Sequence, residues 1–345
     1  MRKWLILGRL RFAAILLCGL AVLLPMAPAE GAEPCLGGPH CWALFPLGGG
    51  LALPVYASHP LDRAAPQIER AVVVVHGIYR NAHQYFPQIT AAADLEGLRK
   101  KTLVVAPAFA ITRDDRPRRE AGEVYWRKNR NWRRGDHSAS RPEGRISSFV
   151  AVERLLTQLG DRRLYPNLRK ITLVGHSAGG QFVQRFAVIQ ALLPALEGVR
   201  VRYVVANPGT YLYLNAQRPA LGQPGFALPY QADRCPRYNR YSYGLERPNW
   251  AMRRVTIGVL LQRAREREVI LLLGAADNDP GHRTLNRTCA AVLQGRHRLE
   301  RGLLFKAHLD HFLAGNRTRV VQVPGVGHSS RGVFGSLEGR RAIFF

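Results

Sequence analysis

The sequence predicts an α/β fold with a mostly parallel central sheet flanked by helices. Short apolar runs rich in β-branched residues recur along the chain, and such runs are typical of strands buried on both faces. Segments with apolar residues at helical spacing lie between them. The chain has 345 residues, of which 47% are hydrophobic and 21% charged, so it can bury a full core and has the composition of an ordered protein.

Residues 1–29 are expected to be a secretory signal peptide. Four basic residues within the first eleven positions precede an apolar run at residues 12–24, and residues 25–29 end in an Ala-x-Ala site. A retained membrane anchor is the alternative, but the run is short for a full span. We therefore expect cleavage after Ala29 and a periplasmic or secreted protein.

The remaining chain, residues 30–345, is expected to form a single domain. Residues 30–70 are rich in Gly and Pro, which predicts an irregular lead-in with an early hairpin near residues 52–56. Residues 207–268 separate two predicted strands, and we interpret this long stretch as a lid-like cap insertion. Its large aromatic residues are Tyr230, Tyr238, Tyr241, Tyr243 and Trp250.

Cysteine usage agrees with export. Without the predicted signal the chain keeps four cysteines, an even number that favours disulfides in an oxidising compartment. Four cysteines permit three pairings, of which we expect Cys35 with Cys41 and Cys235 with Cys289. A zinc site is the alternative, and no Cys-x-x-Cys spacing supports it.

The chain is strongly basic. Its formal charge of +26 falls to +22 when the four basic residues of the predicted signal are removed. Such a charge would attract nucleic acid, anionic lipid or an acidic polymer. Only six of the 50 basic residues are lysine, however, and an arginine bias on a solvated surface is the simpler interpretation. We expect no nucleic-acid partner and leave open an association with an anionic envelope surface; the oligomeric state is not predicted.

Two buried strands are expected in the first half of the chain, at residues 70–75 and 102–107. The first runs directly into the loop His76-Gly77-Ile78. We interpret His76 as a structural residue that orients this loop by hydrogen bonding.

The polar stretch from Arg113 to Arg145 contains eleven basic and six acidic residues, with Tyr125, Trp126 and Trp132 among them. Aromatic residues between arginines can stack on a nucleic-acid strand. We instead expect a loop over the mouth of a site, because the next predicted helix, residues 146–159, leads directly to the strand and turn at residues 170–179.

The most informative segment is Gly175-His176-Ser177-Ala178-Gly179, which matches Gly-x-Ser-x-Gly. An apolar run at residues 170–174 predicts a strand before it, and residues 181–189 predict a helix after it. A strand, a tight turn and a helix form the context of a nucleophile elbow, in which small residues flank a strained serine. Ser177 is therefore the candidate nucleophile.

Three further strands are expected at residues 201–206, 269–273 and 319–323. Asp277 follows the second of these strands, and we prefer it to Asp279 because it lies closer to the strand end. His328 follows the third strand in an exposed turn and is the candidate base.

Other histidines are weaker candidates for the base, namely His282, His297, His308 and His311. The last two are expected to share one helix face, a spacing that would suit a metal ion, but we expect no metal site.

The candidate groups occur in the order Ser177, Asp277, His328. This is the order of the α/β-hydrolase template and differs from the orders of the two serine-protease types. The amides of Ile78 and Ala178 are the expected oxyanion donors, one from the loop after an early strand and one from the start of a helix.

From about residue 50 to its end, the chain resembles the α/β-hydrolase superfamily. Three stretches resemble a bacterial branch related to esterase-like and polyhydroxyalkanoate-depolymerase-like hydrolases, namely Gly175–Arg185, Ala206–Tyr213 and Gln294–Arg298. The resemblance implies a serine hydrolase without a cofactor. Polymer-degrading relatives often carry an extra binding module, for which this sequence has no room, so we expect a small-molecule ester as substrate.

The sequence thus predicts an exported carboxylic-ester hydrolase that works through an acyl-enzyme, with Ser177, Asp277 and His328 as catalytic residues. An amidase or peptidase with the same residues is one alternative. A non-catalytic protein that uses the basic surface to bind an anionic polymer or nucleic acid is the other.

Overall fold

The computed structural model describes residues 35, 39–111, 121–127, 131–139, 144–191, 193–220, 224–229 and 232–345. The predicted signal peptide, Tyr230 and parts of the basic stretch 113–145 lie outside the described residues. Residues Gly31–Phe345 form one compact unit. Among the helices of the described ranges, none is both long and apolar enough to cross a membrane.

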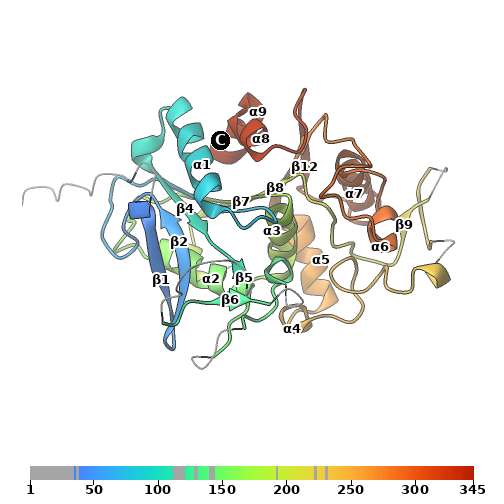
Figure 1. Ribbon diagram of the computed structural model, residues 1–345, viewed down its shortest axis with the longest axis horizontal. Coiled ribbons are helices and arrows are strands. Elements are labelled where there is room, and N and C mark those ends of the chain that lie inside the picture. The colour runs from blue at the N-terminus through green and yellow to red at the C-terminus, as the bar shows by residue number, and fades with distance from the viewer. Residues whose placement is uncertain are drawn as a thin grey trace, which may run out of the picture. The chain divides into compact units, whose positions relative to one another are not determined.

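The unit is built on an eight-stranded sheet with the order β1-β2-β4-β3-β7-β8-β11-β12 (Figure 1). Strand β2 is antiparallel to both of its neighbours, and all other neighbouring strands are parallel. The strands are β1 (Trp42–Gly48), β2 (Leu51–Ala57), β3 (Arg70–Val75), β4 (Thr102–Pro107), β7 (Lys170–His176), β8 (Arg200–Ala206), β11 (Glu268–Gly274) and β12 (Arg319–Val323). The predicted fold class is confirmed.

Helices cover both faces of the sheet, because its central strands are apolar on both sides. On one face pack α1 (Ala82–Leu95), α8 (Ser330–Gly335) and α9 (Leu337–Phe344). The other face carries α2 (Ser148–Leu159), α3 (Ala178–Ile189), α5 (Ile257–Glu266) and α7 (Arg298–Phe312), and Figure 1 shows α1 and α3 on opposite sides of the strands. Alternation along β3 divides the two cores: Val73 and Val75 face α3, whereas Val72 and Val74 face α1.

Short elements complete the unit. Two-residue strands form the pairs β5 (Ala110–Ile111) with β6 (Tyr125–Trp126), and β9 (Arg218–Pro219) with β10 (Phe226–Ala227). The short helices are α4 (Trp250–Arg253) and α6 (Cys289–Val292), and the 3-10 turns are Pro39–Cys41, Arg99–Lys101, Trp132–Arg134, Pro194–Leu196 and Ala232–Arg234.

The lead-in is more regular than the sequence suggested. Strands β1 and β2 form a hairpin that pairs from Trp42 with Tyr56 to Gly48 with Leu51, well beyond the expected residues 52–56. Proline disfavours a strand assignment because it cannot donate to the ladder, and both strands contain one. Pro46 is tolerated because β1 is an edge strand, and Pro54 because β2 pairs with β4 only from Val55 onward.

The tryptophans of the basic stretch belong to the core and not to the mouth of a site. Trp132 stacks on Phe109 with ring centroids 5.1 Å apart, and Trp126 meets the same ring edge-on at 5.2 Å. Both tryptophans are buried, and Phe182 of α3 closes this aromatic cluster. The two tryptophans thus fill the space between the sheet and α3, whereas Arg133 of the same stretch lines a pocket at Ser177, where a loop over the mouth of a site was expected.

One asparagine ties the carboxyl ends of three strands together. Asn207 follows β8 in left-handed conformation, at φ 42°. Its side-chain oxygen accepts from the amide of Gly274 at the end of β11 (2.8 Å), and its amide group donates to the carbonyl of Gly327 (3.3 Å) beyond β12. The loops that follow β8, β11 and β12 are thus held at one edge of the sheet.

We predict that Gly179→Ala destabilises the protein, because a Cβ there would lie 2.0 Å from the carbonyl oxygen of Val75 and backbone cannot move aside easily. Overpacking of this kind costs about 1–3 kcal/mol of unfolding free energy. Gly258→Ala in α5 is the matched control, since a Cβ there meets open space and alanine favours the helix by up to about 1 kcal/mol. Urea unfolding measures both; equal midpoints for the two variants would contradict the close contact.

Candidate active site

Ser177 lies at the sharp turn between β7 and α3. Its backbone has φ 58° and ψ −113°, a strained conformation for a residue with a side chain. Two hydrogen bonds hold it: its amide donates to the carbonyl of Ala206 (2.9 Å), and its carbonyl accepts from the amide of Gln181 (3.1 Å). The strained turn lifts the hydroxyl above the carboxyl edge of the sheet.

Three side chains predicted from the sequence form one hydrogen-bonded chain. The Ser177 hydroxyl lies 3.0 Å from Nε2 of His328, and Nδ1 of His328 lies 2.7 Å from Oδ2 of Asp277. Asp277 follows β11 by three residues and His328 follows β12 by five, so both come from loops that Asn207 holds together. Asp279 stays outside this chain and accepts from the amide of Gly281.

Burial and neighbouring charges set the protonation states of Asp277 and His328. Burial lowers the pKa of His328 below 6.5, and the hydrogen bond to Asp277 offsets this only in part. Burial alone would raise the pKa of Asp277, but the bonds and charges of His328 and Arg298 outweigh it and hold that pKa below 3.8. At neutral pH the pair is therefore a carboxylate beside a neutral imidazole, as a general base requires.

Arg298 at the start of α7 is a second partner of Asp277. Its Nη1 donates to Oδ1 of Asp277 (3.2 Å) and its Nη2 to the hydroxyl of Thr284 (2.9 Å), and the ion pair is almost fully buried. Asp277 thus uses one oxygen for His328 and the other for Arg298, which fixes the carboxylate. The sequence did not predict this role: Arg298 ends the stretch Gln294–Arg298 that resembles related hydrolases, and its partner Asp277 lies 21 residues before it.

The two expected oxyanion amides flank Ser177. Ala178 is the first residue of α3, and Ile78 follows Gly77, whose missing Cβ would lie 3.8 Å from the Cβ of Ser177. Neither amide donates to a backbone carbonyl within the described residues. His76 orients the Ile78 loop: its Nε2 accepts from the amide of Phe109 (2.9 Å) and its Nδ1 donates to the carbonyl of Gly77 (2.8 Å).

Two other histidine rings lie beside His328. The ring of His176 lies 4.6 Å from it and that of His282 5.2 Å. His176 is buried, and its Nδ1 pairs with the hydroxyl of Tyr85 (3.2 Å). Burial and the neighbouring His328 keep the pKa of His176 well below 6.5, so this ring is neutral.

The remaining histidines lie away from Ser177. His297 caps α7 by accepting from the amide of Glu300, and His308 is buried against Tyr213 and Phe312. His311, three residues on, is exposed, so the two do not present one common face to solvent. Across the described ranges no three His, Cys, Asp or Glu side chains are grouped as a metal site would need.

Two pockets meet at Ser177. One, of about 310 Å³, is lined by His328, His282 and Arg331. The other, of about 210 Å³, is lined by Ala178 and Arg133. A larger pocket of about 470 Å³ lies beside the β1–β2 hairpin and shares no residue with either, so we place the candidate site at the smaller pair.

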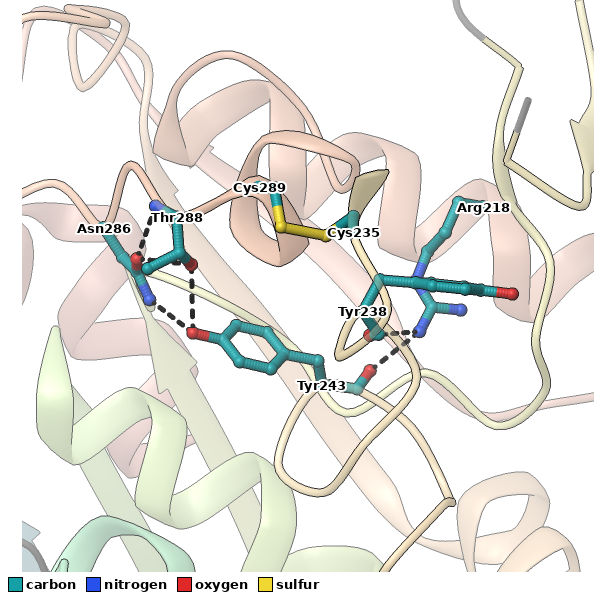
Figure 2. The surroundings of a disulfide bond; sticks show 7 residues. All are labelled: Arg218, Cys235, Tyr238, Tyr243, Asn286, Thr288 and Cys289. Carbon is teal, nitrogen blue, oxygen red and sulfur yellow. Dashed lines mark hydrogen bonds between the residues drawn. A yellow bond between two sulfur atoms is a disulfide. The ribbon is translucent and has the colours of Figure 1, made fainter. Parts of the chain in front are cut away.

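A disulfide supports the wall of the smaller pocket (Figure 2). The Tyr243 hydroxyl accepts from the side-chain amide of Asn286 (2.9 Å), which lines the pocket, and lies 3.2 Å from the Thr288 hydroxyl. Cys289, the next residue, is bonded to Cys235 of the predicted cap. The cap is therefore covalently tied to the loop that follows Asp277.

The structure contains both disulfides that the sequence favoured, Cys35–Cys41 and Cys235–Cys289. They are compatible with an exported protein. That residues 207–268 form a lid-like cap insertion remains a prediction.

Comparison with known proteins places the chain among hydrolases with this fold. Residues 72–334 match the model of the alpha/beta hydrolase family. Poly(aspartic acid) hydrolase-1 from Sphingomonas sp. KT-1 is similar with 25% identity and a TM-score of 0.60, over 88% of this chain and 98% of its own. A poly(3-hydroxybutyrate) depolymerase from Bordetella parapertussis shares the fold with 20% identity and a TM-score of 0.57, over 86% of each chain. Among curated proteins no relative matches.

We predict that the two disulfides differ in their contribution to stability. Cys235–Cys289 spans 54 residues and Cys35–Cys41 spans six, so chain-entropy estimates give about 4 and about 2 kcal/mol of unfolding free energy. Replacing each pair by alanine and measuring urea unfolding tests this. Equal losses from the two double variants would contradict the entropic account.

Proposed function

Because the chain belongs to the alpha/beta hydrolase family, we propose that it is an exported serine hydrolase that cleaves carboxylic esters through an acyl-enzyme. The family and its structural neighbours support hydrolase activity. The observation that carries the proposal is the hydrogen-bonded chain from Ser177 through His328 to Asp277 at a strained turn.

In the first step Ser177 Oγ attacks the ester carbonyl carbon, and His328 Nε2 accepts the hydroxyl proton. Asp277 and Arg298 keep the imidazole in the tautomer with a proton on Nδ1. The amides of Ile78 and Ala178 donate to the oxyanion, and they need no reorganisation because the loop and the helix already hold them beside Ser177.

In the second step the proton on His328 Nε2 passes to the departing alkoxide, which leaves the acyl group on Ser177. Water then attacks the acyl carbon with His328 again as base, and the acid is released. The alcohol part must lie within reach of His328, which assigns it to the pocket that His328 lines. The acyl part then occupies the pocket on the Ala178 side.

Export is part of the proposal. The basic and apolar pattern of residues 1–29 and the two disulfides support it.

Amide hydrolysis is the second candidate reaction. The likeness to a poly(aspartic acid) hydrolase favours it, since that polymer is held together by amide bonds. The same three side chains can serve both reactions. In amide cleavage His328 must protonate the leaving nitrogen before the C–N bond breaks. Matched ester and amide substrates with one acyl group distinguish the two.

We predict that a fluorophosphonate probe adds once to the parent protein and not to Ser177→Ala, as read by intact mass. Ester turnover should fall by about 10⁴-fold or more, because a serine nucleophile has no substitute. Thr157→Ala, which removes a hydroxyl that donates to the Glu153 carbonyl on α2, is the control and should label normally. A folded parent that takes no label would refute the proposal and favour a non-catalytic, basic binding protein.

We also predict the acid limb of the pH profile. His328 must be neutral in the free enzyme to accept a proton, and burial holds its pKa below 6.5. Activity is therefore lost as pH falls through that lowered pKa, and the midpoint of the acid limb lies below pH 6.5. The measurement is kcat/KM against pH with an ester that has no titrating group. A limb centred at pH 7 or above would argue against His328 as the base.

A further inference from the structure

The pocket on the Ala178 side is lined by an arginine, Arg133, for which the described residues provide no carboxylate partner. Arg133 is half-buried in the 3-10 turn Trp132–Arg134, and its Nε donates to the side chain of Asn131 (3.0 Å). No carboxylate among the described residues forms an ion pair with it, and its neighbour Arg134, which carries the same charge, is paired with Asp136. A half-buried cation beside a cavity is costly unless an anion pairs with it.

The other arginine of this pocket differs in being neutralised. Arg298 forms an ion pair with Asp277 through Nη1 and donates a hydrogen bond to the Thr284 hydroxyl through Nη2. Arg133 is therefore the cation of this lining that remains available to a ligand. Asn286 and Gln181 add amide groups to the same lining, so the pocket is polar as well as positive.

Two buried arginines behind the pocket increase its positive potential. Arg185 is fully buried in α3, and its hydrogen-bond acceptors are the carbonyls of Arg133, Gln181 and Ser242 and the hydroxyl of Thr210.

Arg301 is likewise buried. Its guanidinium donates to the carbonyl of Gly295 through Nε and to that of Gly209 through Nη1. Burial lowers the pKa of both Arg185 and Arg301 to about 10, yet both stay charged at neutral pH. Neutral carbonyls orient these charges without cancelling them, and low-dielectric surroundings screen them weakly.

We propose that this pocket binds a carboxylate carried by the acyl part of the substrate, with Arg133 as the residue that selects for it. The proposal rests on the serine-hydrolase function, which assigns the acyl part to this side of Ser177. The substrates would then be half-esters of dicarboxylic acids, or longer acidic chains whose next carboxylate reaches the same pocket. A planar guanidinium matches a carboxylate with two parallel hydrogen bonds.

The test measures binding without turnover. The Ser177→Ala protein is titrated calorimetrically with monomethyl succinate, glutarate and adipate, and with the neutral methyl esters of matching length. We expect the best half-ester to bind about 10- to 100-fold more tightly than its neutral counterpart, as hydrogen bonds to a charged group provide. Equal affinities for charged and neutral members across the series would overturn the subsite.

Variants of Arg133 in the Ser177→Ala background assign the effect. Arg133→Met should abolish the preference for the charged ligand, and Arg133→Lys should keep only part of it because a lysine lacks the planar fork. Arg63→Gln, at an exposed position outside both pockets, should leave the preference unchanged. If Arg133→Met fails to fold, Arg133→Lys decides, and an unchanged preference in either folded variant overturns the assignment.

A parallel experiment keeps the two proposals separate. One sample of the parent enzyme is treated with the fluorophosphonate probe to read labelling by intact mass, and a separate, untreated sample is assayed with the same half-esters and neutral esters. If the probe labels the parent and the untreated sample hydrolyses neutral and charged esters equally well, the carboxylate subsite is overturned and the hydrolase function stands. An unlabelled parent overturns the hydrolase function, while the titration of Ser177→Ala still decides whether the pocket binds a carboxylate.

Discussion

The site depends on a backbone contact that leaves no room for a side chain. The first turn of α3 approaches the end of β3 so closely that a Cβ on Gly179 would overlap the carbonyl of Val75, and one on Gly175 would overlap Gly179 itself. This contact allows the chain to reverse within one residue, so Ser177 adopts its strained conformation above the sheet. Ala178 and Ile78, from the loop after β3, line the same pocket beside Ser177. Every other part of the site, including the loops joined by Asn207, is arranged around a serine whose position the sheet and α3 already determine.

Much of this architecture could be predicted from the sequence, because its signals are local. Apolar runs predicted the central strands, and β3, β4 and β12 have the predicted boundaries. Short-range spacing also placed Ser177, Asp277 and His328 at strand ends, and the structure brings these side chains within hydrogen-bond distance. The predicted superfamily is confirmed by the family match. The hairpin β1–β2 escaped prediction because its prolines contradict strand propensity, and only pairing across the hairpin compensates for them.

The polar environment of the site could not be predicted in the same way. Arg133 was one of eleven basic residues in a single stretch, and nothing local distinguishes it from its solvated neighbours. Arg298 and Asn207 likewise act through partners that lie far away in sequence. The core positions of Trp126 and Trp132 could not be predicted for a related reason, because an aromatic residue between arginines has the same sequence pattern in a binding loop and in a core. Long-range contacts, which composition does not encode, decide these cases.

The disulfide between Cys235 and Cys289 divides the site into two parts with different sensitivities. Ser177, His328 and Asp277 are held by the sheet, by Asn207 and by Arg298, none of which depends on that bond. The wall formed by Asn286 is held through Tyr243, from the segment that the bond attaches. The two parts therefore depend on different conditions. The positions of Ser177, His328 and Asp277 depend on the stability of the sheet, whereas the shape of the pocket on the Ala178 side depends on whether this disulfide is intact. A reducing environment would therefore disturb the pocket wall at Asn286 before it disturbed the hydrogen-bonded chain of Ser177, His328 and Asp277.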